Sequence, residues 1–348
     1  MGKFFSQIIN PAKLRAKLGL IEFTTVAIIY AGFAIYLYMP HFKHLNRLEY
    51  LLVVNPCLAS LGCFMLSRRW VSSLAGSFFA GAMYGFGPFM LGLSGYHPSA
   101  VFLTASIPWL FFPAVFGPKQ QWLKILLSAL PFLAVILFFQ LSAHYRLFVI
   151  PAQAKLNLVD LAIFTAPLVM VNRSTFLVGF YHIPIAPLVF GFCMLLVARR
   201  FGVIAIFATG LILAFCDSAL NISPIIWLSM PVLCCSILIG MGMHGLISAS
   251  YADRRWLLAT ALIMMVLSIT ALLLATKYFQ IFAGLGAKYA ILLTETAKMY
   301  ILGTIAVAIM FFMARAKLRI QWLRWVILCF ASAVDIFLGA RFIVDRAL

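Results

Sequence analysis

Long apolar runs alternate with short polar joints along nearly the whole chain. The runs begin at Leu20 and recur at a length of about 20 residues, which is what an α-helix needs to cross the hydrocarbon core of a bilayer. Charged or Pro/Gly-rich segments separate them. The pattern predicts an all-α, polytopic transmembrane helix bundle of about eleven spans. The predicted spans are residues 20–39, 50–66, 71–93, 100–117, 122–141, 176–197, 201–217, 224–249, 256–276, 289–313 and 320–343.

The composition excludes an ordinary soluble fold. Hydrophobic residues make up 65% of the 348 and charged residues 10%, whereas about a quarter of the residues of a soluble domain are charged. No polar stretch is long enough for an extramembrane domain, so residues 1–348 are predicted to form a single integral membrane domain. The basic segment 1–19 would precede the first span in the cytoplasm, and residues 142–175 would form an interfacial or re-entrant segment on the outer face.

The net charge of +18 would suggest a nucleic-acid partner if the chain were soluble. Here the basic residues lie in the joints between apolar runs, where they set the orientation of a membrane protein. With a cytoplasmic N-terminus, 16 of the 26 lysines and arginines fall on the inner side and 9 on the outer side. We therefore expect a cytoplasmic N-terminus, an outer C-terminus and no nucleic-acid partner. The first run resembles a signal anchor. We expect the cytoplasmic (inner) membrane, because helical runs exclude the alternating strands of an outer-membrane barrel.

The cysteines and histidines give no spacing typical of a metal or haem site. The 7 cysteines lie within or at the ends of apolar runs without a CxxC pair, so we interpret them as small packing residues. Most of the 6 histidines, His182 among them, fall at or near the outer face in this topology. Glycines in two runs, at Gly81 and Gly85 and at Gly240 and Gly242, are predicted to let helices approach closely.

Three ionisable residues interrupt the last two predicted spans. Glu295 and Lys298 lie three positions apart on one helix face, and Asp335 lies in the final span at a similar depth. We expect the three to form one buried cluster if the two helices are neighbours. Such a cluster would act as an ion-pair clasp between helices, as a proton or ion relay, or as a grip on a polar head group, and the clasp is favoured.

Two stretches resemble the GT-C class of membrane glycosyltransferases, in particular the YfhO-like proteins. The first covers residues 60–113 and contains a basic hinge at Arg68-Arg69, a Gly87-Pro88 step in the following span, and His97 in the outer loop. The second covers residues 181–247 and contains an apolar span closed by paired arginines, followed by a glycine-rich span. These features cover a minor part of the chain and are compositional.

The resemblance implies that a sugar is transferred from a polyprenyl-phosphate donor at the outer face, with a carboxylate of the first outer loop as base or positioning group. The sole acid of that loop is Glu49. Asp217, at the outer end of the seventh predicted span, is the other candidate carboxylate. Arg146 and Arg173 would hold the diphosphate, and His97 would lie at the mouth of the site.

Three functions stay open from the sequence. The favoured one is a non-catalytic or degenerate membrane subunit of a larger complex, because acids are few, loops are short and no cofactor motif is present. The second is the glycosyltransferase, so whether the chain is an enzyme is undecided. The third is an ion- or proton-coupled transporter that uses the three intramembrane ionisable residues. Membrane lipids and other membrane protein subunits are the expected partners, and a phospholipid or polyprenyl phosphate, with no metal or cofactor, is the expected ligand.

Overall fold

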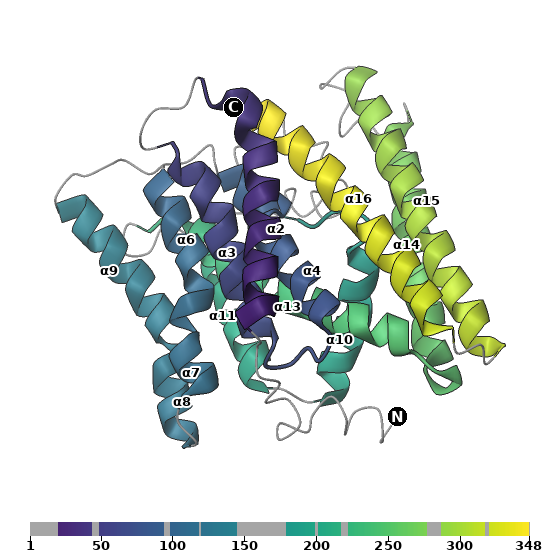
Figure 1. Cartoon of the computed structure of the whole chain (residues 1–348), viewed down its shortest axis with the longest axis horizontal. Coiled ribbons are helices and arrows are strands. Elements are labelled where there is room, and N and C mark those ends of the chain that lie inside the picture. The colour runs from purple at the N-terminus through teal and green to yellow at the C-terminus, as the bar shows by residue number, and fades with distance from the viewer. Residues whose placement is uncertain are drawn as a thin grey trace.

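The computed structural model of the chain is all-helical throughout the part that it describes (Figure 1). The described residues are 20–43, 49–93, 98–117, 120–144, 179–198, 201–216, 222–276, 287–316 and 320–347. The helices are α2 (Leu20–Tyr38), α3 (Leu51–Ser67), α4 (Leu74–Gly85), α5 (Pro88–Gly92), α6 (Pro98–Leu110), α7 (Phe112–Phe116), α8 (Gln121–Ser128), α9 (Leu130–His144), α10 (Ile185–Ala198), α11 (Phe201–Phe215), α12 (Pro224–Trp227), α13 (Ser229–Ser248), α14 (Arg254–Ala275), α15 (Ala287–Arg315) and α16 (Gln321–Ala347).

The helices agree with the prediction of a helical membrane protein. Within the described ranges, 8 helical segments are long and apolar enough to cross a membrane. Three shorter apolar helices, α3, α10 and α11, coincide with other predicted spans. The total of about eleven spans and their orientation stay predictions. Several spans are divided where a proline occupies the start of a new helix, as at Pro88 in α5 and Pro113 in α7, because proline cannot donate the helical hydrogen bond.

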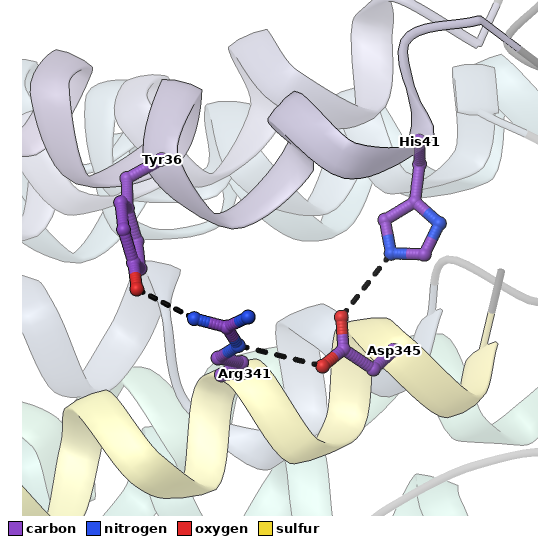
Figure 2. A network of polar contacts seen from close by, with 4 residues as sticks. All are labelled: Tyr36, His41, Arg341 and Asp345. Carbon is purple, nitrogen blue, oxygen red and sulfur yellow. Dashed lines mark hydrogen bonds and ion pairs between the residues drawn. The ribbon is translucent and has the colours of Figure 1, made fainter.

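The first and last described spans point in the same direction. At their C-terminal ends, His41 Nε2 lies 3.2 Å from Asp345 Oδ1, and Arg341 donates to the hydroxyl of Tyr36 at 2.5 Å (Figure 2). Figure 1 shows α16 running obliquely across the bundle to end beside the end of α2.

Small residues bring the central helices into backbone contact, as the glycine pattern predicts. A Cβ atom on Gly240 of α13 would meet the carbonyl oxygen of Gly76 on α4, and one on Gly76 would meet that of Gly240. A Cβ on Gly242 would meet the carbonyl oxygen of Pro187 in α10. Close approach of backbones is how helices pack tightly without large side chains between them. Helices α4, α10 and α13 therefore form the centre of the bundle.

Helix α16 is held at both of its ends. Near its start, the buried guanidinium of Arg324 donates to the carbonyl oxygen of Ala249, just after α13, at 2.6 Å. Near its end, Arg341 binds Tyr36 in the last turn of α2, and Asp345 binds His41 just after α2. Because both ends are attached to other helices, the side chains in the middle of α16 face a fixed part of the core.

Candidate functional site

Two stretches of non-helical backbone, here called the two interruptions, meet inside the bundle. One is the step from α4 to α5 at Phe86 and Gly87. The other is the non-helical segment 179–184, all of it buried, which leads into α10. Irregular backbone at membrane depth is tolerated where protein groups satisfy its polar atoms. Here the hydroxyl of Tyr181 donates to the carbonyl oxygen of Phe86 at 2.7 Å, which joins the two interruptions.

The second interruption contains a buried histidine and carboxylate pair. His182 Nδ1 lies 3.1 Å from Asp335 Oδ1, and the side chains are 2% and 3% exposed. The other carboxylate oxygen, Oδ2, accepts the backbone N–H of Ile183 at 2.6 Å. Asp335 lies in the middle of α16, so one side chain fixes both the imidazole ring and the backbone at the start of α10.

These hydrogen bonds are compatible with an ionised Asp335 and a neutral His182 that donates through Nδ1. Both oxygens of Asp335 accept, which suits an ionised carboxylate, and the proton between the two side chains belongs to His182 Nδ1. The start of α10 adds the positive end of its helix dipole beside the carboxylate. The second ring nitrogen, Nε2, is buried and has no hydrogen-bond partner among the described residues. It is therefore the atom on which a further proton can be bound.

Aromatic and small residues surround the pair. The ring of Tyr300 on α15 meets the ring of His182 edge-on, with centroids 5.2 Å apart. Gly339 of α16 leaves room for the ring of Tyr181, which a Cβ atom at that position would strike. The nearest buried cation on the same helix, Arg324, is eleven positions away, or about 16 Å along the axis. In the described core, His182 is thus the group that can neutralise Asp335.

The predicted cluster of three ionisable residues is wrong in one respect. Lys298 Nζ and Glu295 Oε1 do pair, at 2.6 Å, but both side chains are about 60% exposed on the outside of α15. Asp335 points into the core and binds His182 and Ile183 instead. The reason is the rotation of α15, which directs Ala297 and Tyr300 toward the bundle and therefore turns the charged pair away from it.

The other predicted site residues receive little structural information. Asp217, Arg146, Arg173 and His97 lie outside the described residues, as do segment 1–19 and most of segment 142–175. Glu49 is partly buried just before α3, where its carbonyl oxygen accepts the N–H of Leu52 at 2.8 Å. The sugar-transfer and diphosphate-binding roles of these residues stay predictions. Among the described residues, no group of three His, Cys, Asp or Glu side chains is placed to hold a metal ion.

His182 was not singled out from the sequence, although a signal for it exists. Its segment reads FYHIPIAP, with Pro184 and Pro187 near the start of an otherwise apolar run. Two prolines so close together oppose a helix that begins before them, and a histidine ahead of them is then placed on irregular backbone. No family model, curated protein or solved structure matches the chain.

Replacing Tyr181 with phenylalanine is expected to lower the free energy of unfolding by about 1–3 kcal/mol, because the buried carbonyl of Phe86 loses its donor. Titration with SDS in mixed micelles, followed by circular dichroism, measures this change. Tyr36→Phe is the matched control, since that hydroxyl belongs to a side chain that is 44% exposed. Equal losses in the two variants would contradict the interpretation that Tyr181 joins the two interruptions.

Proposed function

We propose that this polytopic helical membrane protein is a proton-dependent transport protein, and that His182 and Asp335 form its proton-binding site. The observation that carries the proposal is the buried pair itself, with His182 Nδ1 3.1 Å from Asp335 Oδ1 and Nε2 left without a partner among the described residues. Ionisable side chains inside a membrane domain are costly, and they are commonly retained where protons or ions are bound.

The proton changes the charge of the core. With an ionised carboxylate and a neutral imidazole, the pair carries one net negative charge in a region of low polarity. A proton on Nε2 converts it into a neutral ion pair, which removes the electrostatic cost of the isolated carboxylate. The titratable groups around the pair in the described core are Tyr181 and Tyr300, with Tyr38 near Tyr181. None of these phenols supplies a positive charge, so the charge state depends on His182.

The non-helical backbone ahead of α10 supports a role in transport. Secondary transporters place their coupling sites at discontinuous helices near the middle of the membrane, where a helix terminus and free backbone groups meet an ion or substrate. Here α10 begins at Ile185 inside the bundle, and the carboxylate of α16 binds the N–H of Ile183 just ahead of it. A proton on His182 therefore changes the charge beside the carboxylate that holds α16 to the start of α10.

Nuclear magnetic resonance of ¹⁵N-histidine in lipid nanodiscs tests proton binding. Spectra are recorded over a range of pH from about 8 to 5, and the His182 signal, assigned by its loss in His182→Gln, is expected to show a ring that binds a second proton. Asp335→Asn removes the charge that stabilises the protonated ring, and its His182 signal is expected to stay neutral over that range. If the His182 signal of the unsubstituted protein stays neutral throughout, His182 is not a proton-binding group and the proposal fails.

Proteoliposomes that contain a pH-sensitive dye test proton movement. With an imposed pH gradient and valinomycin to clamp the voltage, the unsubstituted protein is expected to acidify the lumen several-fold faster than Asp335→Asn. Asp345→Asn is a matched control, because Asp345 lies on the same helix and also pairs with a histidine, yet is 43% exposed. It should behave as the unsubstituted protein does. Equal rates for the unsubstituted protein and Asp335→Asn would overturn proton transport through this pair.

A further inference from the structure

A serine and a histidine meet at the end of the bundle where α3 is joined to α4. Ser72 Oγ lies 3.0 Å from His244 Nε2. Ser72 is exposed in the joint just ahead of α4, and His244 is half-buried near the end of α13. The topology predicted from the sequence places this joint on the cytoplasmic side. The pair shares no residue with the His182 and Asp335 site.

The close packing of α4 against α13 brings the two side chains together. Gly76 of α4 and Gly240 of α13 are in backbone contact, because neither has a side chain to keep the helices apart. Ser72 precedes Gly76 by four positions, and His244 follows Gly240 by four. Each therefore lies about one helical turn from the contact, and His244 lies on the same face of α13 as Gly240.

The backbone on both sides of Ser72 is fixed. The side chain of Arg68 is only 9% exposed, and its Nη1 donates to the carbonyl oxygen of Ser72 at 3.3 Å. On the other side, Ser73 caps α4, and its Oγ accepts the N–H of Gly76 at 3.1 Å. Ser72 is therefore held in a defined position beside the imidazole ring.

We propose that Ser72 and His244 form a catalytic dyad that hydrolyses carboxylic esters of lipids. A neutral imidazole with its proton on Nδ1 accepts the serine O–H at Nε2, and so acts as the general base that a serine nucleophile needs. Ser72 Oγ bonds to the ester carbonyl carbon while its proton passes to Nε2. The bond from that carbon to the alcohol oxygen then breaks, and Nε2 gives the proton to the leaving oxygen. Water cleaves the acyl-serine by the same steps, which releases the carboxylic acid and restores Ser72.

The start of α4 stabilises the charge that develops in this reaction. During attack, negative charge forms on the ester carbonyl oxygen, and N–H groups at the positive end of a helix stabilise such a charge. Helix α4 has 12 residues, and its first two N–H groups are those of Leu74 and Ala75. An α-helix contains no acceptor of its own for these groups. They follow the nucleophile directly in the chain.

The depth of the dyad selects lipid esters as the substrate. Arg68 ends α3, and Arg69 follows it, so the joint begins with two basic residues. Basic residues that flank a span lie at the level of the lipid head groups. The acyl esters of a phospholipid lie at the boundary between the head group and the tails. Leu74 is 41% exposed at the start of α4 and offers an apolar surface to the acyl chain.

A fluorophosphonate probe tests the nucleophile in lipid nanodiscs. Its phosphorus bonds to the oxygen of an activated serine as fluoride leaves, and mass spectrometry of peptides identifies the labelled residue. We expect label on Ser72 and its loss in Ser72→Ala. His244→Gln keeps a polar side chain at that position but removes the base, so the labelling rate is expected to fall by about a hundredfold.

Ser128→Ala is the matched control, because Ser128 is a partly exposed serine whose hydroxyl donates to the carbonyl oxygen of Ile125 at 2.7 Å. It should be labelled at Ser72 as fast as the unsubstituted protein. All variants are compared as the monodisperse fraction from size-exclusion chromatography. If Ser72 of the unsubstituted protein takes no label, or His244→Gln is labelled at the same rate, the bond between the two side chains only links α4 to α13 and the dyad is overturned.

Phospholipid with a ¹⁴C-labelled acyl chain tests the substrate class. Vesicles that contain the unsubstituted protein and this lipid are expected to release labelled fatty acid, and vesicles with Ser72→Ala are expected to release none above the protein-free background. This readout needs no pH gradient, so it is separate from the test of proton transport. Equal release from the unsubstituted protein and Ser72→Ala would overturn lipid-ester hydrolysis at this site.

Discussion

Replacing Asp335 with alanine is expected to lower the free energy of unfolding by about 3–5 kcal/mol. The variant leaves the backbone N–H of Ile183 and Nδ1–H of His182 without an acceptor in the core. It also releases the start of α10 from α16, because the carboxylate binds both the ring and the backbone of that segment. SDS titration of the purified protein in mixed micelles, followed by circular dichroism, measures the loss.

Asp345→Ala is the control that tests whether the loss of stability depends on the burial of the carboxylate. Asp345 also pairs with a histidine, at 3.2 Å, but its side chain is 43% exposed. Exposed pairs contribute about 1 kcal/mol or less, so this variant should unfold close to the unsubstituted protein. A loss in Asp345→Ala as large as that in Asp335→Ala would mean that the buried site has no special part in holding the core together.

Replacing Gly242 with leucine is expected to cost about 3 kcal/mol or more, and to reduce the amount of protein recovered from the membrane. A Cβ atom at this position strikes the carbonyl oxygen of Pro187, which belongs to the backbone of α10 and has no rotamer by which to yield. The two central helices must separate to admit the side chain. Stability by SDS titration and the folded fraction by size-exclusion chromatography measure the effect.

Gly32→Leu is the control for Gly242→Leu. Gly32 lies within α2, and a Cβ atom there meets nothing within 4 Å. The new side chain points outward, where lipid accepts it, so the change in unfolding free energy should be within about 0.5 kcal/mol. Comparable losses at Gly32 and Gly242 would indicate that both reflect the glycine-to-leucine change in a helix and that the approach of α13 to α10 is not close.

The helical membrane fold could be predicted from the sequence because it depends on run length and composition. A run of about 20 apolar residues specifies a helix of membrane length whatever its neighbours are. The close approach at Gly240 and Gly242 was predicted for a similar reason, since a residue without a side chain permits contact wherever a neighbour lies. Both inferences need only local information.

The partner of Asp335 could not be predicted in the same way. The sequence placed Asp335 near Glu295 and Lys298 by depth, but depth does not give the rotation of a helix about its axis. That rotation is set by packing, which turns Tyr300 inward and the charged pair outward. His182 lies 153 positions from Asp335. Predicting their contact requires the helix order and the late start of α10, and the hydropathy pattern hides that start because residues 179–184 lie inside the predicted apolar span 176–197.

The attachment of α16 to α2 ties the order of synthesis to the completion of the fold. Helix α2 is the first described span to be synthesised, and α16 is the last. The contacts of Tyr36 with Arg341 and of His41 with Asp345 can therefore form only after α16 has been made. The same late arrival brings Asp335 to His182. Until then, the backbone N–H of Ile183 ahead of α10 lacks the carboxylate that accepts its hydrogen bond. Chains that stall before α16 is made would therefore leave this polar backbone unpaired, where quality-control proteases can recognise it.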